Sequence, residues 1–376
     1  MSKVRIHRVV FLMAALFIAT ALSAQAPVPE LKLETGKEIF ESACIGCHGP
    51  GGKGQPQSTL GFEPPPTFPD FSDCNGSTRE KTYDWRSVIH EGGRARGFVE
   101  IMPAFGDALN ADQIKKVMQY LREQCNESKW PLGELNLPRA LITEKAFPED
   151  EWVLTSAVAT NGPGEVNNAL IYEKRFGKRN QLEFALPFSF LHNESGTWVG
   201  GIGDIVLGYK RALIASSKAG SILSWQGEVA LPTGNKSRDL GSGLTLFETF
   251  AAFGQILPAR SFIQIQSGGE FPSDTEKAPR AAFLRTAIGK TFAANQGFGR
   301  IWTPMLEILG DHEFETGSRT NWDLVPEMQV SLSKRQHVLF NFGVRTPVNN
   351  RPGRTTQLVF YVLWDFFDGG LREGWK

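Results

Sequence analysis

The spacing of apolar and polar residues changes partway along the chain. Between residues 34 and 125, apolar residues recur three and four positions apart in patches separated by loops rich in Gly and Pro. From residue 151 to residue 376, apolar and polar residues alternate. The first period is typical of amphipathic helices and the second of half-polar strands. The sequence therefore predicts a helical domain, a linker over residues 126–150 and a β domain.

Two helices are the clearest elements of the first domain. Thr35 and Glu38 have the spacing of a capping box, and the helix that they begin is expected to end near Cys44. The other helix is expected to begin at Asn110 and to end at Cys125, with Gln113 in the second capping-box position. Its apolar face consists of Ile114, Val117, Met118 and Leu121.

Strict alternation predicts the strands of the second domain. In the stretch WDLVPEMQVSL, from Trp322 to Leu332, the even-numbered residues are apolar, while Asp323, Glu327 and Gln329 lie on the opposite face. About twelve such segments follow one another. They are expected to start near residues 151, 167, 180, 201, 221, 243, 261, 280, 298, 320, 336 and 354.

The connections between these segments alternate between long polar loops, such as PTGNKSRDLGSG from Pro232, and short turns, such as GKRN from Gly177, AANQG from Ala293 and SKRQ from Ser333. An even number of strands with this alternation is the pattern of an antiparallel transmembrane barrel in a bacterial outer membrane, with its amino end in the periplasm. A soluble sandwich or lipocalin-like barrel also alternates, but the apolar face is rich in Phe and long enough to cross lipid. Such barrels usually finish on an aromatic residue, whereas Trp375 is next to last.

The first 26 residues have the features of a secretory signal. Three basic residues precede an apolar run, which ends in Ala24-Gln25-Ala26, a small-x-small cleavage pattern. The run is shorter than the roughly twenty residues of a spanning helix, so we expect cleavage after Ala26 rather than a membrane anchor. The formal net charge of zero gives no electrostatic reason to expect a nucleic-acid partner.

Candidate chemistry is concentrated in Cys44-Ile45-Gly46-Cys47-His48, a C-x-x-C-H motif. Two thiols three positions apart can each add to one vinyl group of a haem, and the adjacent imidazole can ligate the iron. A zinc site would need two more ligands, and a redox dithiol would not use the His. The motif therefore predicts one covalently bound haem c.

The sixth iron ligand is predicted downstream. Met102 precedes a proline and lies shortly before the last helix, where its thioether is placed to complete a His/Met site. Most methionines serve only in core packing, but the haem motif upstream favours ligation here. His90 is the rival ligand.

The first domain resembles class I cytochrome c over residues 34–125. The resemblance rests on GKEIFESACIGCHG from Gly36, on MPAF from Met102 and on the closing helix. It implies an all-α domain in which Cys44 and Cys47 form thioethers and His48 and Met102 ligate the iron.

Cys74 and Cys125 are the two remaining cysteines. Outside the cytoplasm two spare thiols usually pair, so we expect a Cys74–Cys125 disulfide; two buried free thiols are the alternative.

The second domain resembles outer-membrane barrels of the phenol-degradation and transporter-like group, on GIGDIVLGYKRAL from Gly201 and on the rhythm of the strands. The order of the domains is similar to that of the iron-oxidising outer-membrane cytochrome-porin fusions, which tend to have more strands. The likeness implies an electron carrier rather than an enzyme, with ferrous-iron oxidation by analogy only, and no catalytic constellation is evident in the sequence.

These patterns give two hypotheses of function for a membrane barrel, and a third in which a soluble periplasmic cytochrome is fused to a β-sandwich. In the first, the haem exchanges electrons with a periplasmic carrier or a small redox-active donor or acceptor that is reached at or through the barrel. In the second, the barrel is a small-solute porin and the cytochrome is its periplasmic plug or redox sensor. The helical domain is too wide for a lumen about 14 Å across, so we expect it to cap the periplasmic mouth on an extended tether that can reach inward. The expected polar lumen side chains are Glu183, Lys210, Glu228, Arg285, Glu307, Glu327 and Arg345.

Overall fold

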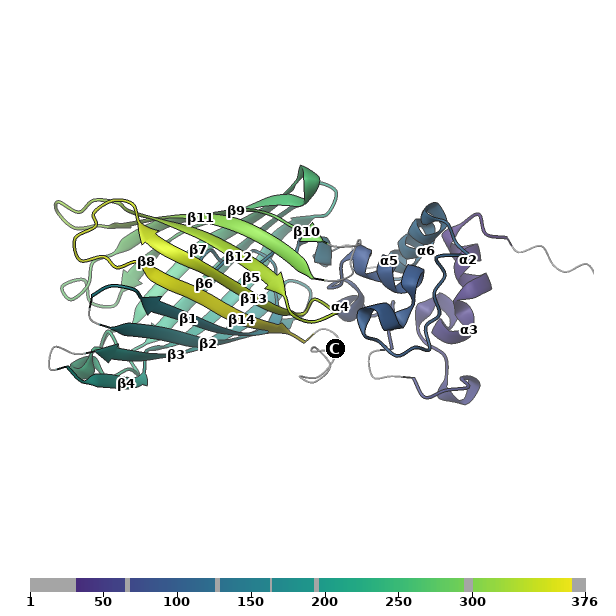
Figure 1. The fold of residues 1–376 in the computed structure, drawn as a ribbon, viewed down its shortest axis with the longest axis horizontal. Helices are drawn as coiled ribbons and strands as arrows, with labels where there is room; N and C mark the ends of the chain where they lie inside the picture. The colour runs from purple at the N-terminus through teal and green to yellow at the C-terminus, as the bar shows by residue number, and fades with distance from the viewer. Residues whose placement is uncertain are drawn as a thin grey trace, which may run out of the picture.

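The computed structural model describes residues 32–64, 68–125, 129–162, 164–192, 196–293 and 300–366. The predicted signal, most of the turn from Ala293 and the Trp375 terminus lie outside the described residues. Figure 1 shows a helical domain seated against one end of a long β-barrel. Among the described residues, no helix is long and apolar enough to cross a membrane.

Both predicted capping boxes are present in the helical domain. Thr35 caps the first helix and exchanges hydrogen bonds with Glu38, and Asn110 does the same with Gln113 at the last. The α-helices among the described residues are α2 (Gly36–Ala43), α3 (Ile45–His48), α4 (Cys74–Ser77), α5 (Thr82–Glu91) and α6 (Ala111–Glu123).

The core of this domain forms where α2 meets α6. Ile39 and Phe40 of α2 are buried against the apolar face of α6, whose four predicted residues are all buried. A disulfide joins Cys74, at the start of α4, to Cys125, just beyond α6, which confirms the predicted pairing. The C-terminal end of the closing helix is thereby linked to α4.

Twelve antiparallel strands close the barrel, counting interrupted strands once and within the described residues. β4 and β5 both pair with β3, and β9 and β10 both pair with β11, so each of these pairs is one interrupted strand. The strands are β1 (Asp150–Ala159), β2 (Glu165–Phe176), β3 (Asn180–His192), β4 (Trp198–Ile202), β5 (Ile205–Ser216), β6 (Ser221–Leu231), β7 (Leu246–Leu257), β8 (Ser261–Pro272), β9 (Ala281–Lys290), β10 (Phe292–Ala293), β11 (Ile301–Glu313), β12 (Asn321–Ser331), β13 (Val338–Pro347) and β14 (Gln357–Asp365). When each interrupted strand is counted once, from its first residue or, for β9 and β10, from that of β9, all twelve begin within three residues of their predicted starts. Pairing of β9 with β11 closes the ring.

The two faces of the barrel have opposite character. Along β12 the predicted division holds, because Asp323, Glu327 and Gln329 are buried on the inner side while Trp322 is exposed outside. Large apolar side chains such as Leu182 and Phe342 are about half exposed on the outer face. A soluble barrel would bury its apolar side chains, so this arrangement is that of a barrel surrounded by lipid.

The chain between the two domains lies inside the barrel. Residues 132–149, here called the inner segment, have little regular structure beyond the turn Gly133–Leu135. Leu135 and Phe147 are almost completely buried. The backbone of this stretch bonds to inward-facing side chains such as Glu307 and Gln266, which replace the partners that a strand or helix would supply. The segment expected as a tether therefore fills the lumen near the helical domain.

The helical domain is also joined to the barrel directly. Arg79 forms an ion pair with Asp150, the first residue of β1. The inner segment begins against the same region, where the amide of Gly133 donates to the carbonyl of Thr78 at 2.7 Å and Glu134 accepts from the amide of Thr82 at 2.7 Å. These contacts place the domain at the end of the barrel that carries the short turns (Figure 1).

Candidate haem site

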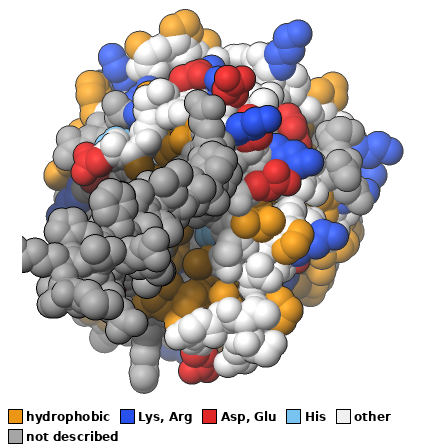
Figure 2. All heavy atoms as spheres, turned by 90° about the vertical axis from the view of Figure 1, so that its right-hand side faces the viewer, with side chains coloured by type: hydrophobic (Ala, Val, Ile, Leu, Met, Phe, Trp, Pro, Cys, Tyr) orange, Lys and Arg blue, Asp and Glu red, His pale blue; other side chains and the backbone are white. Residues whose placement is uncertain are grey.

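One cavity of the helical domain gathers the predicted haem residues. It measures about 260 Å³ and is lined by Cys44, Cys47, His48 and Met102 together. Most of the remaining wall is apolar, and includes Phe40, Phe62, Phe68, Phe71, Trp85 and Ile89. Figure 2 looks onto this end of the molecule, where apolar side chains lie in a hollow below a group of acidic and basic ones.

A single helical turn presents the C-x-x-C-H motif to this cavity. The amides of Cys47 and His48 both donate to the carbonyl of Cys44, at 3.2 and 2.9 Å, so the thiols and the imidazole come from adjacent positions of one turn. The chain then reverses at Gly49, whose φ of +69° and close approach to the carbonyl of Gly54 leave no room for a Cβ. Gly49 therefore lets the motif end directly at the cavity wall.

The imidazole of His48 is held by aromatic rings. It stacks on Phe68 with ring centroids 5.1 Å apart and lies 5.5 Å from the ring of Phe71. Burial lowers its pKa to about 4, so the imidazole is neutral at pH 7. Its Nδ1 is buried and has no hydrogen-bond partner among the described residues. A neutral imidazole in an apolar wall is suited to bind iron.

The two thiols of the motif are separate and differ in exposure. Cys44 is half-buried and Cys47 is exposed, and neither forms a disulfide. Burial, with a smaller effect of Cys47, raises the pKa of the Cys44 thiol to about 11. Two thiols outside any disulfide, at the edge of an apolar cavity, are in the place that addition to haem vinyl groups requires.

Met102 reaches the cavity from a loop that is fixed to the end of α5. Its carbonyl accepts a hydrogen bond from the amide of Gly93 at 3.1 Å, and the amides of Phe105 and Gly106 donate to the carbonyls of Ile89 and His90, both at 2.9 Å. His90, the rival ligand, is not among the residues that line the cavity, and its Nδ1 lies 2.8 Å from Glu91 Oε1. The structure thus brings Met102, and not His90, together with the motif.

These residues fit a haem. The donor set of a neutral imidazole and a thioether, with two thiols at the edge of an otherwise apolar cavity, is the one that a His/Met haem c uses. The sequence did not reveal the polar part of the wall, which consists of Glu80, Asp84 and the buried Arg96. Arg96 pairs with Asp84 at 2.7 Å, and no periodicity distinguishes it from the exposed Arg94 beside it.

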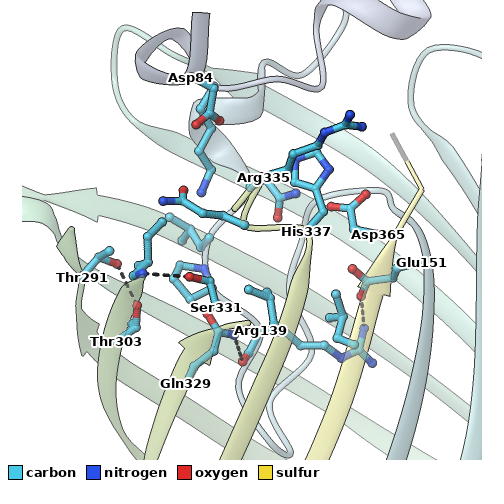
Figure 3. Close-up of a pocket in the computed structure, with 18 of the residues that line it drawn as sticks. Asp84, Arg139, Glu151, Thr291, Thr303, Gln329, Ser331, Arg335, His337 and Asp365 are labelled. Carbon is cyan, nitrogen blue, oxygen red and sulfur yellow. Dashed lines mark hydrogen bonds and ion pairs between the residues drawn. The ribbon is translucent and has the colours of Figure 1, made fainter. Parts of the chain in front are cut away.

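A second, smaller cavity lies between the helical domain and the barrel. It measures about 100 Å³ and shares Glu80 and Asp84 with the wall of the haem cavity. Figure 3 shows Asp84 above it, Arg335, His337 and Asp365 beside it, and Arg139, Glu151 and Gln329 below it, within the barrel. The haem cavity and the mouth of the lumen are therefore separated by one polar layer.

Several predicted lumen side chains bond to the inner segment. Glu307 accepts from the amides of Ile142 and Thr143, at 3.0 and 2.6 Å through its two oxygens, and Lys210 lies 3.6 Å from Glu144. Glu327 accepts from the amide of Leu141 at 2.9 Å. The others interact within the barrel wall: Glu183 and Glu228 with Gln226, Arg285 with Asp311, and Arg345 with Asp323.

Comparison with known proteins supports the division into two domains. Residues 32–121 match the family model described as cytochrome C oxidase, cbb3-type, subunit III. The comparison with curated protein sequences finds no relative of the chain.

Solved structures resemble the barrel. The COG4313 outer membrane channel from Pseudomonas putida F1 has 13% identity and a TM-score of 0.40, covering 61% of this chain and 100% of its own. The KdgM porin in complex with disordered oligogalacturonate has 10% identity and a TM-score of 0.38, covering 57% and 99%. The beta domain of the Bordetella autotransporter BrkA has 12% identity and a TM-score of 0.36, covering 57% and 98%. At such low identities and TM-scores, what these proteins transport says nothing about this chain.

The chain thus joins a helical c-type cytochrome domain to a closed barrel of twelve antiparallel strands. A c-type cytochrome domain binds haem and transfers electrons, and the apolar cavity lined by His48 and Met102 has the residues that would fit such a haem.

Proposed function

We propose that this protein is an outer-membrane electron carrier with one haem c. Cys44 and Cys47 attach the haem covalently, and His48 and Met102 ligate its iron. The observation that carries the proposal is that all four side chains line one apolar cavity, although Met102 lies 54 residues beyond His48. When bound, the haem supplies a one-electron couple between Fe(II) and Fe(III).

The apolar outer face supports a position in the outer membrane. The short turns lie at the end of the barrel that carries the helical domain, and in outer-membrane barrels short turns face the periplasm. The helical domain is therefore assigned to the periplasmic side, where a soluble electron carrier has access to it. The half-exposed Val99 and Ile101 in the wall of the cavity leave its edge accessible.

The inner segment obstructs the path through the lumen between the outside and the haem cavity. It occupies the lumen next to the haem domain, so a solute entering from outside meets Arg139, Glu307 and their partners before it meets the haem cavity. This favours exchange at the barrel over free diffusion through it. It also argues against the alternative of a small-solute porin that is open at rest, because such a pore requires displacement of the inner segment.

The test uses the full-length holoprotein, produced with a c-type maturation system and purified from outer membranes. The proposal is supported if haem remains attached to the protein after denaturation. It is also supported if the Soret band shifts within seconds of mixing with ferrous iron, small organic donors or a reduced periplasmic cytochrome. A colourless product with a Soret band absent refutes the haem. A coloured product that none of these donors reduces, in detergent or in proteoliposomes, refutes electron transfer.

A further inference from the structure

A turn of the barrel contacts the loop that carries Met102. The turn spans residues 332–337, between β12 and β13, and its Arg335 is 4% exposed. The guanidinium carbon of Arg335 lies 4.2 Å from the centroid of the Phe98 ring, and its Nη2 donates to the carbonyl of Gly97 at 3.1 Å. In return, Arg96 Nη2 donates to the carbonyl of Arg335 at 2.8 Å. Three consecutive residues of the helical domain are thus in contact with one residue of the barrel.

The contacted residues belong to the wall of the haem cavity. Arg96, Phe98 and Met102 all line it, and they lie on one loop between Gly92 and Pro103. The Gly93–Met102 hydrogen bond closes the base of this loop. Its tip has little support from its own domain, because Val99 and Ile101 are 50% and 40% exposed. The barrel therefore supplies contacts to the loop that the helical domain does not.

The turn is built to hold its position. The hydroxyl of Ser333 accepts from the amides of His337 and Val338, both at 3.1 Å, and the amide of Gln336 donates to the carbonyl of Ser333 at 3.1 Å. The carbonyl of His337 accepts from the amide of Asp365 at 2.9 Å, which ties the turn to the end of β14. A tight turn fixed to two strands is a rigid platform for the Arg335 side chain.

We propose that Arg335 is a positioning residue for the haem. By stacking on Phe98 and bonding to Gly97, it holds the loop so that Met102 stays against the iron and closes that side of the cavity. The barrel is then part of the haem site and sets its properties, in addition to anchoring the domain. This inference rests on the ligation by Met102 proposed above.

The experiment compares full-length holoproteins that carry Arg335→Ala, Arg335→Lys or Lys334→Ala. Lys334 is the exposed neighbour on the same turn and is the matched control. Three quantities are measured: the affinity of the ferric haem for imidazole, which competes with the thioether; the charge-transfer band of Met-ligated ferric haem; and the midpoint potential. None of them depends on a physiological donor.

We expect imidazole to bind about tenfold more tightly to Arg335→Ala than to the wild type, which corresponds to a Met102–iron interaction weaker by about 1.4 kcal/mol. The charge-transfer band should weaken and the midpoint potential should fall, because thioether ligation raises the potential. Arg335→Lys keeps the charge but loses the planar fork, so it should show a smaller change in the same direction. Lys334→Ala should match the wild type.

Equal imidazole affinity and midpoint potential in Arg335→Ala and the wild type overturn the inference. If Arg335→Ala does not accumulate as a holoprotein, the test uses Arg335→Lys instead. An imidazole affinity and a midpoint potential of Arg335→Lys that equal those of the wild type also overturn the inference. If Lys334→Ala changes the imidazole affinity and the midpoint potential as much as Arg335→Ala does, the inference is also overturned, because any alteration of the turn then has this effect. A wild type that lacks the Met-ligated band refutes the ligation by Met102 instead, so the two failures can be told apart.

Discussion

Arg139 of the inner segment donates to Glu173 of β2 at 2.6 Å, and the carboxylate of Glu173 is completely buried inside the barrel. The same guanidinium donates to Glu151 at 2.8 Å and to Glu144 at 3.0 Å. The carbonyl of Arg139 accepts from Tyr361 Oη at 2.7 Å. One residue of the inner segment is thus bonded to strands on both sides of the β1–β14 seam.

Replacing Arg139 should loosen the inner segment. Arg139→Ala leaves Glu173 buried without its ion-pair partner and leaves Glu151 with Lys145 alone, and breaking a buried ion pair in this way typically costs about 3–5 kcal/mol. We expect the variant to give proteoliposomes a higher conductance for small ions and to expose the inner segment to added protease. Arg238→Ala, in an exposed loop, is the control. Wild-type conductance and protease resistance in Arg139→Ala would show that the segment is held by other contacts.

The choice between the two sixth ligands can be decided by a pair of variants. Met102 lines the haem cavity, whereas His90 lies outside it beside Glu91. Met102→Ala should abolish the charge-transfer band of Met-ligated ferric haem and lower the midpoint potential, because the thioether stabilises the reduced iron. His90→Ala should leave both unchanged. The opposite pattern, with the spectrum altered only in His90→Ala, would make His90 the ligand.

The sequence predicts those features that depend on neighbours along the chain. Alternation located the strands, and capping boxes at Thr35 and Asn110 located the helix starts, because both signals lie within a few residues. Alternation also placed Glu307 on the inner face, but it contains nothing about Thr143, the partner 164 residues away. Arg335 and Gly97 are 238 residues apart, so their contact follows only from how the two domains dock.

For the inner segment, the sequence predicted the local conformation but not the contacts. Pro131, Pro138 and Pro148 and the absence of periodicity indicated an extended chain, and regular structure is indeed scarce there. The amides of an extended chain need partners, and here Gln266, Glu307 and similar side chains of the barrel wall supply them. An extended linker and a polar lumen were both predicted from the sequence, but the fit of one inside the other depends on tertiary geometry.

The disulfide should contribute measurably to the stability of the haem domain. Cys74 and Cys125 are separated by 51 residues, and closing such a loop stabilises by about 4 kcal/mol in the chain-entropy model. The variant with Cys74→Ser and Cys125→Ser should therefore unfold at a lower guanidinium concentration than the wild type. Unfolding is monitored by the change in the Soret band. Alkylation of the unfolded wild type before reduction, read by intact mass, should modify neither of these two cysteines. Their modification without reductant would contradict the bridge.

The pH dependence of the haem spectrum follows from the surroundings of His48. Burial lowers the pKa of this imidazole from its ordinary value to about 4, so the folded protein keeps it neutral where an exposed His would already be protonated. A proton competes with iron for the same nitrogen lone pair, and because burial and iron ligation both disfavour the protonated imidazole, this competition begins no higher than about pH 4 to 5. We therefore expect the Soret band of the ferric holoprotein to be constant between pH 7 and about pH 5 and to change below that. Phe68→Ser, which replaces the stacked ring by a small polar side chain, should let water reach the imidazole and move this change to higher pH. A spectral transition near pH 6.5 in the wild type would show that the imidazole titrates as an exposed group does and that the cavity fails to shield it.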